Sequence, residues 1–384
     1  MRKLYFAIYP SKEGSITEEW EQCLDGILGS VSSEHTVVKI NVFADLPDFM
    51  TLLDFREKIM RSVSENFRDC CPAFNLTIHP PEKPWKIAVE VSAISGRSVK
   101  CISRRFREIP YVVIESDSSK EIWSAGISSY KFPDDTFMAA TDAFNMVVDL
   151  LAAENMSLNN IVRQWNYIGN ILSIEGGSQN YQVFNEVRKD FYSRFRESGN
   201  YPAATGVGMK SGNVILDFRA LDLKDPSAIV PVNNPDQINA YEYGQDVLKE
   251  SLITKGSVKH PPKFERALIT RTSNVVHMHI SGTASIIGQE TVGRDNIEQQ
   301  TLTTIRNIHK LTEIEHVNKL FHNESFSHVS FSLIRVYIKS MKDLKVVRQI
   351  CNEHFPGIPA LFIEADICRD DLLMEIEAEV ELNQ

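Results

Sequence analysis

Hydrophobic and polar positions in the last two thirds of the chain repeat one pattern twice. Strands that end at Gly126 and Gly282 are each followed by a polar loop. A helix with apolar residues at three- and four-residue spacing then begins, at Thr141 in one copy and at Thr301 in the other. A second strand, a second helix and two closing strands follow in both. Each copy therefore predicts the order strand, helix, strand, helix, strand, strand over roughly 120 residues.

The register of the two copies agrees near their ends. Pro202 and Pro359 open the penultimate strands, and the closing strands carry Asp217 and Glu375, 15 and 16 residues later. Amphipathic helices that alternate with strands in this order predict an α+β fold with mixed sheets and helices packed on one face.

The pattern divides the chain into four segments. Residues 1–104 predict an N-terminal α/β module from apolar segments at 4–9, 36–43 and 85–91, without a legible repeat. Residues 105–225 and 265–384 are the two copies. Residues 226–264, rich in proline, predict a connector that lines a site, because structureless loops of this length are uncommon.

Composition narrows the classes of function. The 384 residues carry 41 basic and 51 acidic side chains, a net charge of −10, which argues against a nucleic-acid scaffold. No run of 18 apolar residues predicts a membrane span, and the apolar start ends at Pro10, too early for a signal peptide. Six cysteines without C-x-x-C spacing predict neither a disulfide framework nor a zinc ribbon, so we expect a reduced, cytoplasmic protein.

Several motifs resemble a known family. Residues 280–288, Ile-Ser-Gly-Thr-Ala-Ser-Ile-Ile-Gly, with Gln300-Thr301 and the closing Glu-Ile-Glu-Ala, resemble the RidA (YjgF) superfamily. The fuller set resembles the chorismatases, which include the 3-hydroxybenzoate synthases; it comprises residues 163–167, 264–267, 281–288 and 365–377. This resemblance implies tandem RidA-like (chorismate-mutase-like) modules.

The resemblance also implies an activity and a set of site residues. The reaction is cofactor-free cleavage of chorismate, which releases pyruvate from its enolpyruvyl ether. The implied residues are Glu375 as the acid, Arg188 and Arg348 as substrate-binding arginines, Tyr243 or Tyr241 from the connector, and Gly282 with Cys368 in the ring pocket. In the dihydrodiol-forming subgroup the last two positions are alanines, so the pair favours 3-hydroxybenzoate over a dihydroxycyclohexadiene carboxylate.

The implied reaction requires a proton donor and cationic side chains. A vinyl ether is cleaved by protonating its methylene carbon, so the enzyme needs a carboxylic acid that keeps its proton near pH 7. Glu375 alternates with Met374 and Ile376 and therefore faces the opposite side of the strand. If that side is buried, the pKa of Glu375 is raised, because burial disfavours the charged carboxylate. If the strand lies at the edge of the sheet, Glu375 faces water instead. Two substrate carboxylates suit two guanidinium groups, although a helix arginine is also a common surface charge.

Other interpretations stay open. His277 and His279 have metal-like spacing, but no third ligand is apparent, so we expect no metal. A RidA-like imine deaminase would keep an arginine where Ala203 and Ala360 stand. A non-catalytic binder of aromatic or keto acids is the third possibility. RidA proteins are typically trimers, but a tandem chain can satisfy such interfaces internally, so a monomer is favoured.

Overall fold

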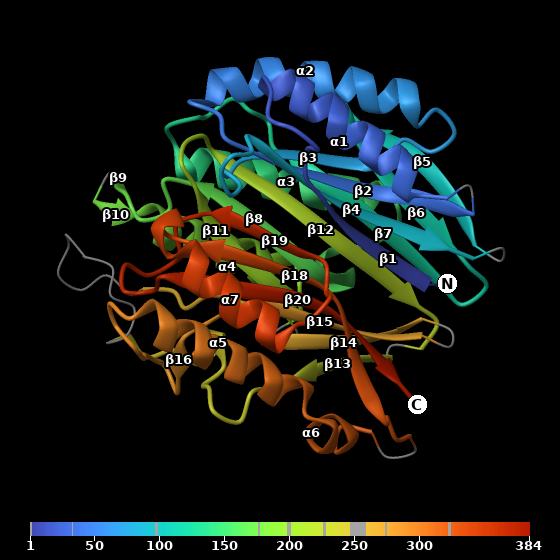
Figure 1. The fold of residues 1–384 in the computed structure, drawn as a ribbon. Coiled ribbons are helices and arrows are strands. Elements are labelled where there is room, and N and C mark those ends of the chain that lie inside the picture. Colours follow the sequence, from blue (N-terminus) through green and yellow to red (C-terminus); the bar gives the residue numbers. More distant parts are fainter. Residues whose placement is uncertain are drawn as a thin grey trace.

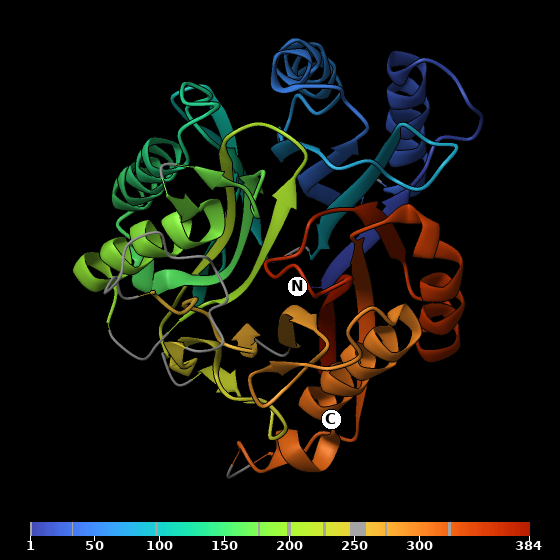
Figure 2. The same cartoon turned by 90° about the vertical axis from the view of Figure 1, so that its left-hand side faces the viewer.

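Three modules surround a common centre, with sheets facing inward and helices outside (Figures 1 and 2). The computed structural model describes residues 2–32, 34–96, 99–175, 177–197, 201–225, 228–245, 259–272, 275–321 and 324–384. Residues 226–227 and 246–258 of the predicted connector lie outside the described residues.

The first module contains the repeat that the sequence pattern left illegible. Its elements are β1 (Arg2–Ile8), α1 (Ile16–Ser30), β2 (His35–Ala44), α2 (Phe49–Asn66), β3 (Ala73–Ile78) and β4 (Ile87–Ser95). The strand order is β1-β4-β2-β3, with β2 and β3 parallel and the other neighbours antiparallel. The N-terminal segment is therefore a third copy of the strand, helix, strand, helix, strand, strand unit.

The second module extends this unit by a hairpin. Its elements are β5 (Lys100–Phe106), β6 (Ile109–Glu115), β7 (Ser119–Ile127), α3 (Thr136–Ala153), β8 (Ile161–Gly169), β9 (Ile174–Glu175), β10 (Ser178–Gln179), α4 (Asn180–Phe195), β11 (Ala203–Met209) and β12 (Val214–Leu223). The main sheet has the order β11-β8-β12-β7-β6-β5. Since β5 pairs with β6, the predicted boundary between residues 104 and 105 falls inside a strand of this module.

The third module follows the same plan. Its elements are β13 (Ile229–Val232), β14 (Ala267–Thr272), β15 (Val275–Ala284), β16 (Ile286–Ile287), β17 (Glu290–Thr291), α5 (Ile297–Thr312), α6 (Ile314–Asn318), β18 (His328–Ile338), α7 (Leu344–His354), β19 (Ala360–Glu364) and β20 (Met374–Asn383). The main sheet has the order β13-β14-β15-β20-β18-β19. The connector thus supplies edge strand β13, and the short helix α6 lies between α5 and β18.

Side-chain caps set where the repeat helices begin. Asp135 accepts a hydrogen bond from the Met138 amide at 2.9 Å, and Asn296 accepts one from Gln299 at 3.0 Å. Such caps satisfy amides that the first helical turn leaves without partners. Both helices therefore begin a few residues before the predicted Thr141 and Thr301. Among the described helices, α3 alone is long and apolar enough for a membrane span, but half of it is buried inside the protein.

Strand alternation decides what reaches the centre of the molecule. On β20, Met374 and Ile376 face the helices α5 and α7 and belong to the core of the third module. Glu375 and Glu377 alternate with them and face the centre, as period-two geometry requires. The helices are thereby kept on the outside, and the polar face of β20 meets the other two modules.

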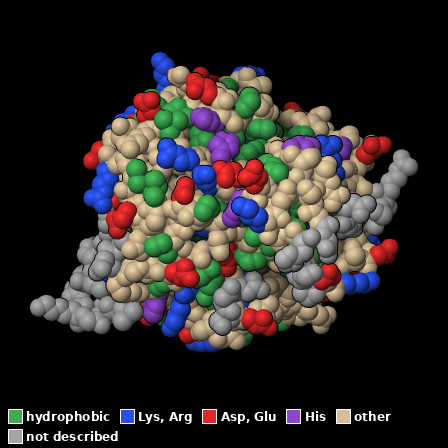
Figure 3. Space-filling model, turned by 90° about the horizontal axis from the view of Figure 1, so that it is seen from below, with side chains coloured by type: hydrophobic (Ala, Val, Ile, Leu, Met, Phe, Trp, Pro, Cys, Tyr) green, Lys and Arg blue, Asp and Glu red, His purple; other side chains and the backbone are tan. Residues whose placement is uncertain are grey.

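The modules are joined edge to edge into a ring. Backbone bridges link Ala203 to Glu265, Gly208 to Asp366 and Pro81 to Ile363. A hydrophobic cluster also combines side chains of all three modules, including Phe43, Tyr167 and Tyr337. On the face shown in Figure 3, basic and acidic side chains are interspersed, with no continuous basic patch among the described residues.

Candidate active site

A cavity lies between the second and third modules and is partly covered by the connector. It measures about 670 Å³, counting its open mouth. The second module contributes Tyr181, Arg188 and residues 204–206, the connector contributes Tyr243, Pro262 and Phe264, and the third module contributes Arg266, Gly282, Ala284, Ile286, Cys368, Arg369, Leu372 and Glu375. Five of the six residues predicted from the sequence, all except Arg348, thus meet in one place.

Glu375 is the buried carboxyl group of this cavity. Its residue is only 4% exposed. Burial, and after it the neighbouring charge of Glu377, raises the pKa of Glu375 to about 8, although Arg163 and Arg266 act in the opposite direction. A carboxyl group with this pKa keeps its proton at neutral pH and can act as a general acid.

Gly282 leaves the space that the Glu375 carboxyl occupies. A Cβ at position 282 would lie 1.9 Å from Glu375 Oε1 and 3.1 Å from the Thr205 methyl group, so no side chain fits without displacing the acid. The Gly282 amide donates a hydrogen bond to Thr205 Oγ1 at 3.0 Å, which fixes the strand against the second module. The close approach therefore explains why glycine stands there.

Cys368 and Arg369 enter the cavity together. In an extended segment two consecutive side chains would point to opposite sides, but residues 368–371 form a bend and a turn, so both line the cavity. Cys368 packs against the hydrophobic clusters of the second module and of the centre. In this position the Cys368 side chain forms part of the cavity wall.

Three guanidinium groups approach the cavity from three different elements. Arg188 on α4 donates to Asn185 Oδ1 at 2.7 Å, and Arg266 donates to the Ile238 carbonyl and to Tyr243 Oη, both at 2.6 Å. Arg369 donates to the Gln289 carbonyl at 2.9 Å, and its guanidinium lies 5.0 Å from the centre of the Tyr243 ring.

None of these three guanidinium groups forms an ion pair with a carboxylate of the described residues. The Nε atoms of Arg188 and Arg266 are buried and have no hydrogen-bond partner within the structure. Buried cations without anionic partners are costly, because the protein interior screens charge poorly. The cavity is therefore suited to an anionic ligand with more than one carboxylate.

Arg348 lies outside the cavity. It forms an ion pair with Glu82 of the first module and lies over the Phe362 ring, 4.5 Å from its centre. Arg188 and Arg348 occupy matching helix positions, but in a ring of modules α4 faces the interface of modules two and three, whereas α7 faces that of modules three and one. Matching positions consequently reach two different interfaces and cannot hold one ligand.

The structure replaces Arg348 with two arginines that sequence reasoning missed. Arg266 and Arg369 both stood inside the quoted motifs, next to Glu265 and Cys368. The resemblance implied the helix arginines Arg188 and Arg348 instead. Of the two connector tyrosines, Tyr243 lines the cavity, while Tyr241 packs on Tyr201 at 5.2 Å between ring centres.

The His277–His279 pair lies away from the cavity. His279 Nδ1 is 2.6 Å from Glu379 Oε2, and its Nε2 is 3.0 Å from Thr270 Oγ1. Burial lowers the pKa of His279 to about 4. Across the part of the chain that the structure describes, no cluster of three possible metal ligands occurs.

Comparisons with known proteins relate the chain to one family. Residues 107–220 match the family described as "Chorismatase FkbO/Hyg5-like, N-terminal". A 3-hydroxybenzoate synthase of Streptomyces hygroscopicus is 32% identical over 251 residues, which cover 63% of this chain and 69% of the relative. A chorismatase of Streptomyces rapamycinicus is 27% identical over 250 residues, which cover 64% of this chain and 70% of the relative.

The fold is also similar to a solved structure. A crystal structure of a chorismatase aligns over 99% of both chains with a TM-score of 0.66 and 19% sequence identity. At this identity the likeness concerns the fold, and it extends through all three modules, including the first.

Proposed function

The chain belongs to the chorismatase family, and from this premise we propose that it cleaves chorismate to pyruvate and 3-hydroxybenzoate, with Glu375 as the general acid. The observation that carries the proposal is a buried carboxyl group that keeps its proton at neutral pH, in a cavity with three cations that form no ion pair with any described carboxylate. Chorismate combines a vinyl ether with two carboxylates, and these are the groups that such a site would bind and protonate.

The proposed chemistry begins with one proton transfer. Glu375 protonates the methylene carbon of the enolpyruvyl group, and the electron pair of the double bond forms the new C–H bond. The resulting oxocarbenium ion weakens the bond between the ring and the ether oxygen, and pyruvate leaves. The neighbouring ring hydroxyl then supplies the oxygen for the carbon that pyruvate vacates, and loss of a ring proton, which returns to the Glu375 carboxylate, completes 3-hydroxybenzoate. Together, 3-hydroxybenzoate and pyruvate contain all the atoms of chorismate, so this branch consumes no net water. The dihydroxycyclohexadiene branch adds one water.

The other cavity residues would bind the substrate carboxylates and shape the space around the ring. Arg188, Arg266 and Arg369 would bind the two carboxylates, with Tyr243 holding Arg266 and Arg369 in place. Gly282 allows the acid to lie against the strand, and Cys368 limits the space beside the ring.

The alternative of a RidA-like deaminase is disfavoured, since alanine follows the proline of the penultimate strand in all three modules, at Ala73, Ala203 and Ala360. A cytoplasmic location is supported by six cysteines that form no disulfide.

Replacing Glu375 with Gln should remove the proton donor while keeping the shape of the side chain. We expect pyruvate formation from chorismate to fall by at least about a hundredfold, the usual contribution of a general acid. In the wild-type enzyme the protonated form is active, so kcat/KM should be high below pH 8 and fall as the pH rises through about 8. Wild-type turnover in the variant would exclude Glu375 as the acid.

Arg188 and Arg348 form a matched pair for testing carboxylate binding. Arg188→Ala should lower kcat/KM roughly tenfold to a hundredfold, since a hydrogen bond to a charged group contributes about 1.5–3 kcal/mol. Arg348→Ala removes a half-exposed ion pair with Glu82 and should leave kcat/KM within about twofold of wild type. Equal losses in the two variants would contradict the assignment.

The double variant Gly282→Ala, Cys368→Ala should change the product. The new Cβ must displace Glu375 Oε1, and the smaller residue at 368 opens space for water beside the ring. Chromatography of the products should therefore show a shift from 3-hydroxybenzoate toward a dihydroxycyclohexadiene carboxylate. An unchanged product ratio would count against the role of these two positions.

We further propose that one chain is the complete catalytic unit. The cavity is built from the second module, the connector and the third module of a single chain, and the ring of modules closes on itself. Light scattering should give a mass close to 43.6 kDa, with activity per chain independent of dilution. A threefold larger mass would contradict this proposal.

A further inference from the structure

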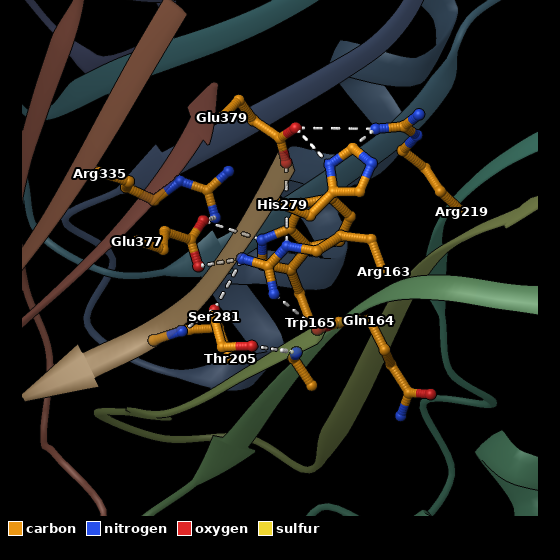
Figure 4. Close-up of polar contacts among 12 residues, drawn as sticks. Arg163, Gln164, Trp165, Thr205, Arg219, His279, Ser281, Arg335, Glu377 and Glu379 are labelled. Carbon is orange, nitrogen blue, oxygen red and sulfur yellow. Dashed lines mark hydrogen bonds and ion pairs between the residues drawn. The ribbon is translucent and has the colours of Figure 1, made fainter. Parts of the chain in front are cut away.

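A chain of buried ion pairs runs through the centre of the molecule beside the cavity. Eight side chains, none more than 9% exposed, alternate in charge along it. Their order is Lys3, Glu121, Arg219, Glu379, Arg163, Glu377, Arg335, Glu90. Figure 4 shows its middle part, from Arg219 to Arg335. The chain joins all three modules and contains four cations and four carboxylates.

Glu377 is the member of this chain nearest to the acid along β20. Its two carboxylate oxygens are 2.9 Å from Arg163 Nη2 and 2.8 Å from Arg335 Nη1, and Trp165 Nε1 donates to it at 2.8 Å (Figure 4). Two guanidinium groups and an indole N–H together stabilise the ionised carboxylate. Glu377 therefore presents a fixed negative charge on the same strand face as Glu375.

The three interfaces between modules can be compared at equivalent positions. Strand pairing makes Glu90, Asp217 and Glu375 equivalent, since they lie opposite Asn41, Trp165 and Tyr337 in the three modules. Two residues before each of these partners stands a cation, at Lys39, Arg163 and Arg335.

The first two equivalent carboxylates each bind the cation of the preceding module in the ring. Asp217 is 2.8 Å from Lys39 Nζ, and Glu90 is 2.5 Å from Arg335 Nη2. By the same relation Glu375 would pair with Arg163, but Arg163 binds Glu377 at 2.9 Å. Among the described residues, the acid is thus the one of the three equivalent carboxyl groups that forms no ion pair with its expected cation, which Glu377 binds instead.

We infer that Glu377 is a positioning residue, which occupies Arg163 and Arg335 with its own charge and thereby keeps the proton on Glu375. This inference rests on the proposed function, in which Glu375 donates that proton. The remaining charged and titratable groups around the acid come from four other elements: Tyr181 and Arg188 on α4, Arg266 before β14, Tyr243 in the connector, and Cys368 and Arg369 before β20. The three arginines among them are cations that would favour deprotonation, so the negative charge of Glu377 opposes them.

Two substitutions with opposite expected effects test this role. Glu377→Gln frees Arg163 and Arg335, which should then attract the Glu375 carboxylate and lower its protonation midpoint by about one to three pH units. Arg163→Gln removes the cation instead and should raise the midpoint. Loss of packing alone would move both midpoints in the same direction, and that result would overturn the inference.

The protonation of Glu375 can be measured without substrate. Each variant is compared with a second protein that also carries Glu375→Gln. The infrared difference spectrum of the two contains the carbonyl band of the protonated Glu375 side chain, and the intensity of this band is followed as the pH is changed. The pH dependence of kcat/KM for pyruvate formation gives the second readout, and both midpoints should move together. An infrared midpoint in Glu377→Gln equal to that of wild type would overturn the inference.

Glu379→Gln is the matched control. It removes a buried carboxylate from the same strand face and the same ion chain, where Glu379 binds His279 and Arg219. We expect a much smaller shift of the Glu375 midpoint than in Glu377→Gln; equal shifts would contradict a local role. If Glu377→Gln does not fold, the upward shift expected for Arg163→Gln decides the question.

The readouts also separate this inference from the proposed function. A wild-type protein that releases no pyruvate from chorismate would refute the function, while the infrared titration would still test the effect of Glu377 on Glu375. An active wild-type enzyme whose infrared midpoint is insensitive to Glu377 would refute the inference alone.

Discussion

The alternating chain of buried charges is the constraint on which the rest of the structure depends. Its members come from β1, β4, β7, β8, β12, β18 and β20, so it can form only when all three modules are in place. Removing one partner of a buried pair typically costs about 3–5 kcal/mol, because the other charge is left in a medium of low polarity. Complete pairing therefore favours one arrangement of the modules and fixes the register of β20, on which the acid stands.

A ring of three similar modules offers three equivalent interfaces, but the side chains differentiate them. At the interface of modules one and two, Asp217 accepts hydrogen bonds from the Gly126 amide and from Asn75, as well as the ion pair from Lys39. At that of modules three and one, Arg335 binds Glu90 and donates to Tyr337. Protein groups thus satisfy both carboxylates. Only at the interface of modules two and three does the equivalent carboxyl group face the cavity described above, where a ligand can reach it.

Much of this could be predicted from the sequence, because hydrophobic periodicity reports local structure. The order of elements in two modules and the orientation of Glu375 followed from periodicity within short segments, whereas Gly282 and Cys368 were implied by the resemblance to a known family. The first module was missed although Pro72-Ala73 matches Pro202-Ala203 and Pro359-Ala360, since its closing strand lies further from the proline. The position of Arg348 depends on which interface α7 faces, and the engagement of Arg163 by Glu377 depends on packing across modules. Local periodicity indicates neither of these two contacts.

In the proposed function, the site must meet two opposing electrostatic requirements. Binding a dianion requires cations, yet cations near Glu375 favour loss of the proton that the acid must donate. The structure meets both demands by separating the charges: Arg266 and Arg369 are held by Tyr243 and by backbone carbonyls, whereas the fixed anion Glu377 lies beside the acid along β20. A bound dianion would neutralise the cavity arginines and so offset the cations that favour deprotonation of Glu375. Substrate binding would therefore strengthen retention of the proton until the vinyl ether accepts it.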